Sequence, residues 1–241
     1  MIRITEAWFE FKGKRSDDMG IRLRQMPTRG MPAERGKYEE LPGRSGALWF
    51  SEDGYGTVDV RIECDVPDGR MDSIAAWLTG GGLLRFSDEP NRAYEARIIR
   101  SFSRSNPLPR FTLQRFTVVF SCQPFRLLYP AADDIVITTS GTTLDMVGTA
   151  PAAPRVTIYG SGDFMVAIGR QAMFFTDISD GVIVDSDLMD ALTLDGGGLL
   201  NNHVSGDFFT LDPGYPTMVS WTLDSGAAVS KIIITPRWRY F

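Results

Sequence analysis

The stretch from residue 71 to residue 130 constrains the fold of this chain more than any other. It begins with apolar residues at helical spacing, followed by a glycine triplet at 80–82, which ends a helix because glycine adopts the left-handed C-cap conformation without a Cβ clash. Asp68 or Asp72 can cap the start of this helix. A helix of about nine residues is marginal in water, so we expect it to lie on a sheet. Its apolar stripe consists of Met71, Ile74, Ala75 and Leu78.

The residues on both sides of the helix predict that sheet. Segments 83–87 and 94–100 have the composition of strands and flank a turn at 88–91. In two further segments, 58–64 and 116–122, apolar residues alternate with others, so that one face of each strand is apolar. The sequence therefore predicts a mainly β fold, with a β-sandwich and one short helix in the N-terminal part.

Two polar segments of the N-terminal part show no periodicity. Residues 26–37 (MPTRGMPAERGK) and 101–110 (SFSRSNPLPR) are rich in proline, glycine and charge. We predict that both are extended arms, the first of them an exposed loop or hairpin. Loops of this length are uncommon in a compact domain unless they have a function, and reaching over a neighbouring subunit is one such function.

Charge is unevenly distributed along the chain. Residues 1–130 carry 20 Lys and Arg against 17 Asp and Glu, a net charge of +3, whereas residues 131–241 carry 5 against 13, a net charge of −8. The basic residues of the first part are interspersed with acidic ones, which is not typical of a nucleic-acid-binding patch. The shift predicts two domains, residues 1–130 and 131–241. Short strands with Gly and Asp turns predict a β-sandwich for the second.

Few residues could carry out catalysis or bind a metal. The single histidine, His203, has no partners at catalytic or zinc-ligand spacing, and we interpret it as structural. Cys64 and Cys122 lie in apolar strands and are expected to be buried free thiols, with a disulfide between them as the alternative. A group of aspartates lacks the ligand order of an EF-hand and is interpreted as solvated turn residues. This group comprises Asp177, Asp180, Asp185, Asp187, Asp190 and Asp195.

We therefore expect no catalytic residues, no cofactor and no metal site. No apolar run approaches the roughly 20 residues that span a bilayer, so no membrane contact is expected. The N-terminal residues lack the apolar core of a signal peptide, which predicts a protein made and used without secretion. On these residues alone, the chain is a β-rich protein with arms and no evident enzymatic site.

Short motifs run through the N-terminal part in a set order. These motifs are Phe9–Phe11, Gly13, Ser16–Asp17, Met19–Ile21, Leu41–Gly46, Ala76–Leu78, Leu84–Pro90, Tyr94–Ala96 and Phe116–Phe125. In that order and spacing, they resemble the distal tail protein (Dit) family of phages with long, non-contractile tails, in its short form without an inserted sugar-binding module. The C-terminal part is similar to the galectin-like sandwich of that family at 148–149, 154–158 and 236–240.

This resemblance implies a structural protein of the virion tail tip, made in the cytoplasm of the host bacterium, and not an enzyme. It implies a homohexameric ring in which an arm of each subunit laps its neighbour and DNA passes through the lumen. The ring would join the tail tube protein to the tail-tip hub, and the galectin-like domains would dock receptor-binding or fibre proteins. On the arms, Arg29, Arg35 and Arg104 are candidates to meet acidic patches of the adjacent subunit.

Other functions are compatible with the same residues. A carbohydrate-binding module of a virion or cell-surface protein is the main alternative, because the family's fold is similar to that of galectins. Galectin sugar sites use a His, Asn and Arg set with a Trp and a Glu, and no Glu follows Glu95 in this chain. We therefore expect Trp221 and Trp238 to be core or interface residues. A cell-wall hydrolase, a different baseplate component with the same sandwich, and a trimer of the same fold are further alternatives.

Overall fold

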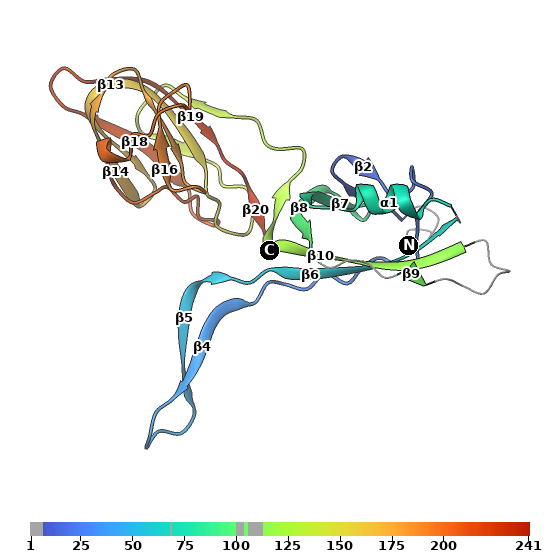
Figure 1. The fold of residues 1–241 in the computed structure, drawn as a ribbon. Coiled ribbons are helices and arrows are strands. Elements are labelled where there is room, and N and C mark those ends of the chain that lie inside the picture. Colours follow the sequence, from blue (N-terminus) through green and yellow to red (C-terminus); the bar gives the residue numbers. More distant parts are fainter. Residues whose placement is uncertain (1–6, 68, 100–103, 106–112) are drawn as a thin grey trace. The chain divides into compact units, whose positions relative to one another are not determined.

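The computed structural model describes residues 7–67, 69–99, 104–105 and 113–241. The chain divides into two compact units (Figure 1). One comprises residues 1–129 together with Phe241, and the other comprises residues 130–240. Both are built from antiparallel strands, and the only α-helix among the described residues is α1 (Met71–Trp77), so the prediction of a mainly β fold with one short helix is confirmed. No helix in the described part of the chain is long and apolar enough to cross a membrane.

The first unit contains one large sheet, in the order β2-β1-β7-β8-β10-β6-β3, with β9 also pairing with β10. Strand β10 is the longest, and it pairs with β6 in unbroken register from Leu113 opposite Pro67 to Cys122 opposite Val58. The strands of this sheet are β1 (Phe9–Phe11), β2 (Lys14–Arg15), β3 (Arg22–Leu23), β6 (Val58–Pro67), β7 (Gly81–Phe86), β8 (Glu89–Ile98), β9 (Arg104–Ser105) and β10 (Leu113–Leu128).

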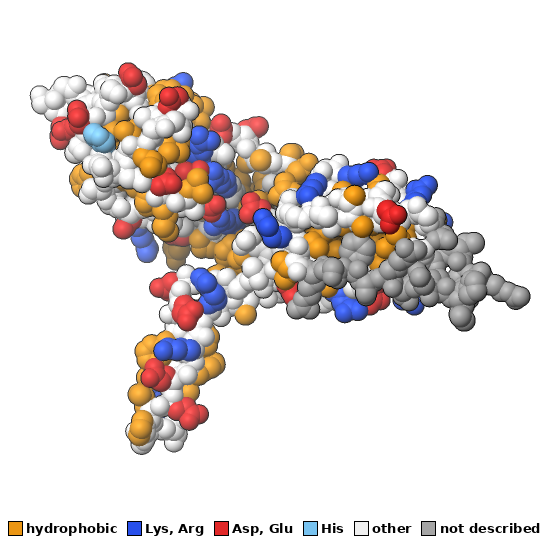
Figure 2. Space-filling view, viewed as in Figure 1, with side chains coloured by type: hydrophobic (Ala, Val, Ile, Leu, Met, Phe, Trp, Pro, Cys, Tyr) orange, Lys and Arg blue, Asp and Glu red, His pale blue; other side chains and the backbone are white. Residues whose placement is uncertain are grey.

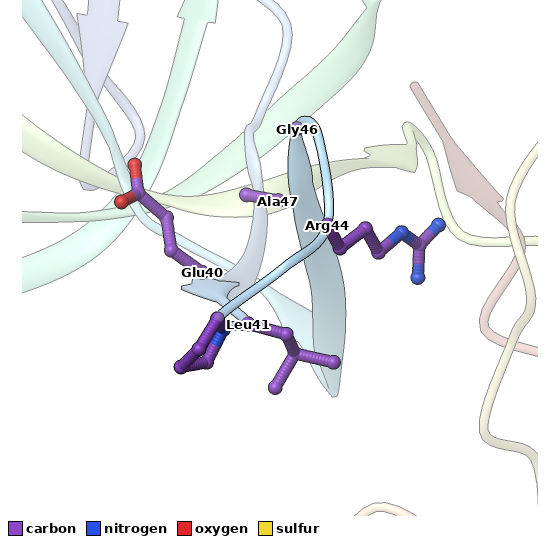
Figure 3. Close-up of a pocket in the computed structure, with 6 residues that line it drawn as sticks. Glu40, Leu41, Arg44, Gly46 and Ala47 are labelled. Atoms are coloured by element: carbon purple, nitrogen blue, oxygen red, sulfur yellow. The ribbon is translucent and has the colours of Figure 1, made fainter.

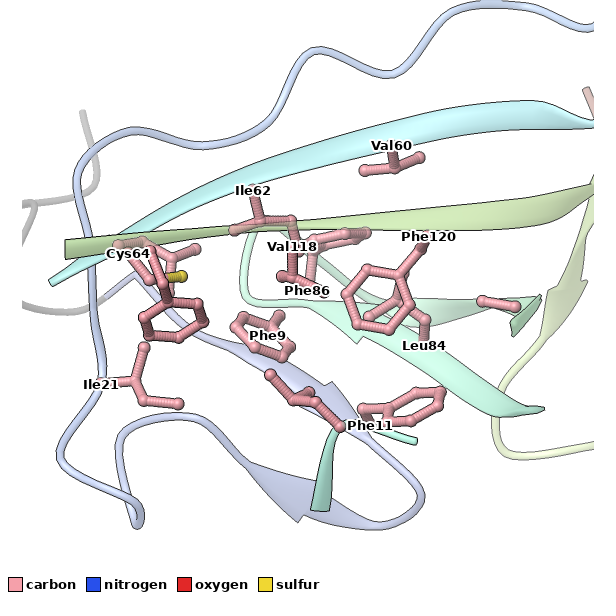
Figure 4. Close-up of a cluster of buried hydrophobic side chains, with 14 of the residues drawn as sticks. Phe9, Phe11, Ile21, Val60, Ile62, Cys64, Leu84, Phe86, Val118 and Phe120 are labelled. Carbon is pink, nitrogen blue, oxygen red and sulfur yellow. The ribbon is translucent and has the colours of Figure 1, made fainter. Parts of the chain in front are cut away.

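The alternation predicted for segments 58–64 and 116–122 is confirmed. Their even-numbered side chains are buried in one core, where they meet Phe9 and Phe11 of β1 (Figure 4). The Phe120 ring packs edge-on against Phe11 with centroids 5.0 Å apart. Helix α1 closes this core: Trp77 stacks on Phe9 at 5.6 Å, and its Nε1–H donates to the Phe11 carbonyl over 3.0 Å. The helix is thus held by the sheet, as its short length requires.

Three expectations about this region need correction. Among the described residues no carboxylate caps the helix: its N-cap is Arg70 without a side-chain bond, and Asp72 lies within the first turn, while Asp68 is outside the described residues. Ala75 is exposed, so the buried stripe is Met71, Ile74 and Leu78. The helix ends at Trp77, and of the glycine triplet only Gly80 has a positive φ (+67°).

The turn between β7 and β8 is also shorter than predicted. Glu89 already begins β8, so three residues of the predicted turn belong to that strand. A register shift between Arg85 and Phe86 accounts for the difference, because a bulge inserts a residue without ending the ladder. The composition of residues 88–91 favours a turn, but pairing between β7 and β8 makes Glu89, Pro90 and Asn91 part of a strand.

The second unit is built around one long strand, β13 (Arg155–Ile168), where the sequence pattern predicts two separate strands, at 156–160 and at 164–168. Its first half pairs with β15 and β19, and its second half pairs with β14 and β18. The bend lies at Gly160 and Gly162: a Cβ on Gly160 would lie 2.5 Å from the Ala228 carbonyl oxygen, and Gly162 has a φ of +83°. The inward side chains of both halves fill one core, as in a β-sandwich.

The remaining strands complete this unit. Strand β11 pairs with β19, β12 with β18, β16 with β15 and β17 with β14. Their bounds are β11 (Ile135–Ile137), β12 (Thr142–Leu144), β14 (Gln171–Ile178), β15 (Val182–Asp185), β16 (Asp190–Leu192), β17 (Val204–Gly206), β18 (Thr217–Leu223), β19 (Ala228–Thr235) and β20 (Arg239–Tyr240), with a 3₁₀ turn η2 (Asn201–His203).

Candidate assembly surfaces

The first unit carries a hairpin whose two strands form a separate sheet. Strands β4 (Glu34–Glu40) and β5 (Ala47–Tyr55) pair only with each other and stand away from the large sheet (Figure 1). The predicted arm, residues 26–37, overlaps this hairpin only at 34–37; residues 26–33 form no strand, and the hairpin extends to Tyr55. We call residues 34–55 the arm.

Aromatic side chains are exposed on both faces of the arm. Tyr38 lies opposite Trp49, their ring centroids are 4.8 Å apart, and they are 73% and 42% exposed. On the other face, Phe50 is 45% exposed opposite Lys37. Figure 2 shows these hydrophobic side chains interspersed with charges of both signs. An isolated two-stranded hairpin is only marginally stable in water, and exposed aromatic patches of this kind are typical of interaction surfaces.

The tip of the arm is a loop with a shallow hollow of about 410 Å³. Gly43 and Gly46 have φ values of +80° and +82°, which the reversal of the chain requires. Arg44 extends away from the loop, and Glu40 extends on the opposite side (Figure 3). The hollow holds no pair of titratable groups arranged for proton transfer, and we interpret the tip as a contact surface. Its lining consists of Glu40, Leu41, Pro42, Arg44, Gly46 and Ala47.

The three arginines predicted on the arms lie on different elements. Arg29 precedes the arm and binds within its own unit: Nη1 lies 3.0 Å from Asp88 Oδ1, Nη2 contacts the second oxygen, and the guanidinium lies 4.9 Å above the Phe86 ring. Its side chain is only 16% exposed. Arg29 therefore has an intramolecular role that the sequence did not predict.

Arg35 and Arg104 are placed differently. Arg35 is exposed on β4, and its guanidinium lies over Gly54 of β5, where an added Cβ would be 2.5 Å from Nη2. Arg104 lies on β9 opposite Phe116. The rest of the second predicted arm, apart from Ser105, falls outside the described residues. The structure does not bring the three arginines together, and their role toward another subunit stays a prediction.

We compared the chain with known proteins. No protein-family model matches the sequence, and no curated protein sequence matches it. The structure matches the crystal structure of SPP1 Dit, described as a paradigm of the hub adsorption apparatus in phages that infect Gram-positive bacteria. The TM-score is 0.76 at 17% identity, over 98% of this chain and 99% of that chain. The chain has the Dit fold.

A chain of the phage P2 baseplate, in its activated conformation with Ca, matches with a TM-score of 0.50 at 9% identity, over 97% of this chain and 98% of that chain. The same baseplate with Sr gives 0.50 at 8% identity, over 95% and 97%. The resemblance that the sequence motifs indicated is thus confirmed as a fold. Because the match to SPP1 Dit covers nearly all of both chains, the Dit fold extends over both units.

The two cysteines of this Dit-like chain are free and buried, as predicted. Burial raises the pKa of Cys64 to about 12, and the carboxylates of Asp65 and Glu63 add to the effect. Burial likewise raises the pKa of Cys122 to about 12. Since the thiolate is the reactive form, both side chains behave as small apolar core residues.

His203 makes a local structural contact. Its Nδ1 lies 3.0 Å from the Thr176 carbonyl oxygen, which fixes the ring beside β14. With three aspartates it borders a cavity of about 580 Å³ in the second unit. Within the described residues, no group of three His, Cys, Asp or Glu side chains is arranged to hold a metal ion. The aspartates at this cavity are Asp177, Asp180 and Asp195.

One aspartate of that group is not solvated as expected. Asp185 is buried and accepts two hydrogen bonds of 2.7 Å from Arg237, and also the backbone N–H of Asp187 over 3.1 Å. The Arg237 hydrogen bond lowers the pKa of Asp185 against the opposing effect of burial. A second pair, Asp187 with Arg239 at 2.5 Å, joins the same loop to the end of this unit. These pairs fasten the loop between β15 and β16.

The tryptophans of the second unit also have structural positions. Trp238 is 5% exposed and belongs to the core, whereas Trp221 is half-buried. The residues that sequence reasoning missed are Tyr38, Trp49 and Phe50 on the arm. A signal was present, because aromatic residues on both sides of the glycine turn at 43–46 are spaced so that two of them face each other across a hairpin.

Proposed function

We propose that this protein is a structural component of a phage tail tip, forming a homohexameric ring through its N-terminal unit. The single observation that supports this most is the arm: a separate two-stranded sheet with exposed aromatic side chains on both faces. Its exposed rings need a covering surface, and an arm that reaches a different patch on the next copy generates a ring when the rotation closes. The Dit fold of the whole chain supports the same proposal.

In this ring, the tail tube protein binds one face and the tail-tip hub protein binds the other. DNA passes through the lumen, and the C-terminal units dock receptor-binding or fibre proteins. In this proposal the protein acts through its surfaces; in the described part of the chain, its two thiols are buried and its histidine lies against a backbone carbonyl. It would be made in the host cytoplasm and work in the virion.

The experiment is a measurement of mass by static light scattering over a range of concentrations. The chain is measured alone and after mixing with the tube and hub proteins of the same phage, because some rings assemble only with their partners. We expect a six-copy particle in at least one of these conditions. A chain that stays monomeric in all of them would contradict the proposal.

A further inference from the structure

The outer face of the large sheet of the first unit contains a hollow of about 390 Å³ over β7, β8 and β10. Arg97 of β8 is paired with Gly81 of β7 on one side and with Ser121 of β10 on the other. Both neighbours are small, and the Arg97 side chain lies over Gly81, where an added Cβ would be 3.5 Å from Nε. Leu83, 38% exposed, adds an apolar wall. The hollow therefore offers an apolar wall and an accessible cation, with the carboxylate of Glu95, opposite Leu83, also in its lining.

Arg97 has no counter-ion in the described part of its own chain. It is exposed, and no ion pair or side-chain hydrogen bond joins it to another described residue. Three other arginines of the first unit are bound within it: Arg29 to Asp88, Arg85 to Glu10 and Arg126 to Glu89. Arg97 is thus a positive charge available to a partner.

One face of the arm has the complementary features. Strand alternation puts Glu40 on the same face as Tyr38, and Ala47 of β5 lies opposite Glu40. Glu40 is exposed and has no cation beside it among the described residues. Glu34 lies on this face too, whereas Arg35 and Lys37 point to the other face. This face therefore combines two aromatic rings with carboxylates and lacks a cation on β4.

We propose that the Tyr38–Trp49 face of the arm of one copy occupies the Gly81–Ser121 hollow of the next copy, with Glu40 paired to Arg97. The occupant is a second copy, because the exposed carboxylate beside the rings matches the unpaired cation of the hollow and both belong to this chain. The Arg97 guanidinium can also lie against an aromatic face of the arm. Arm and hollow are different surfaces, so the contact is heterologous and continues around a ring.

This inference rests on the proposed ring and names the surface that receives the arm. The experiment uses the full chain with Ala47→Cys and Gln123→Cys together, oxidised with a disulfide catalyst. The native thiols give little background, since burial raises the pKa of each to about 12. We expect a ladder of covalent multimers, with a peptide linking residues 47 and 123. The matched control replaces Ala47→Cys by Leu48→Cys, on the opposite face of the arm, and is expected to give no ladder.

A second measurement uses charge. Glu40→Arg or Arg97→Glu alone should weaken self-association about tenfold, and the two together should restore it, as expected for a close ion pair. Glu39→Arg, with the same charge change on the other arm face, should have little effect. A six-copy particle that gives neither a ladder nor charge rescue would overturn this inference and leave the ring proposal intact. A chain that is monomeric alone and with its tube and hub neighbours would remove both.

Discussion

The core of the first unit and the arm each contain a pair of aromatic rings at nearly the same separation, but the core pair is buried and the arm pair is exposed. In the core, Phe11 and Phe120 lie 5.0 Å apart and are fully buried. On the arm, Tyr38 and Trp49 lie 4.8 Å apart and are largely exposed. The core rings are covered by the chain itself, through α1 and the strands around it. The described residues give the arm rings no such cover, so the comparison separates residues that stabilise the fold from residues that we propose serve assembly.

Truncation of a core ring should have the largest effect. Phe120→Ala removes a fully buried ring, which typically costs about 3–5 kcal/mol of unfolding free energy through lost contacts and a cavity. The measurement is urea unfolding followed by tryptophan fluorescence. Val119→Ala, one position along on the other face of β10, is the control and should cost much less. Equal losses for the two variants would contradict the assignment of the buried face.

Truncation of an arm ring should change assembly and leave the fold intact. Trp49→Ala removes an exposed ring, so we expect unfolding to change by no more than about 0.5 kcal/mol. Self-association should weaken by about 2 kcal/mol, as for an aromatic side chain at the centre of an interface. Analytical ultracentrifugation gives the second quantity. A Trp49→Ala chain that unfolds early and assembles normally would reverse the roles assigned to arm and core.

The ion pair between Asp185 and Arg237 should have an intermediate effect confined to the second unit. Asp185→Asn should destabilise that unit by about 1–3 kcal/mol, the usual loss for hydrogen bonds to a charged group. Because the pKa of Asp185 is lowered in the fold, its contribution is present above the usual carboxyl value of 3.8 and is lost as pH falls through the lower folded value. The unfolding temperatures of the wild-type chain and of Asp185→Asn, measured between pH 7 and pH 2, should therefore converge at acidic pH. A difference that grows as the pH falls would be inconsistent with the pair.

The smallest expected effect is at the cysteines, which should not react at all in the native chain. Burial raises the pKa of both thiols to about 12, so a thiol-specific reagent at neutral pH should label neither of them until the chain is unfolded. Both should then react. Labelling of Cys122 in the native state would show that the core beneath β10 opens, and would weaken the contrast with the arm.

Much of this architecture could be predicted from the sequence, for physical reasons that also set the limit. Alternation with a period of two identified the buried faces of β6 and β10, because one face of each strand is buried and the other is nearer to solvent. It failed at β13, where Gly160–Gly162 interrupts the pattern and looks like a turn, although the strand continues and changes its partners there. Local composition cannot show that a strand continues past a glycine bend by pairing with new neighbours.

The arm shows that the same limit of local sequence patterns applies to the candidate functional residues. The proline, glycine and charge of residues 26–37 predicted an exposed segment there, but not the hairpin at 34–55 or its aromatic face, because Tyr38 and Trp49 become neighbours only through the hairpin register. Arg29 shows the converse: its charge suggested a partner subunit, and the fold gives it Asp88. Spacing along the chain says little about contacts between residues 59 positions apart.

Native mass spectrometry of the wild-type chain beside Trp49→Ala, each with its tube and hub neighbours, tests the central claim most directly. The claim predicts a wild-type particle of six chains, about 161 kDa from six times 26.8 kDa, and smaller species for the variant. A wild-type chain found only at 26.8 kDa, or a variant that forms the six-copy particle equally well, would contradict it.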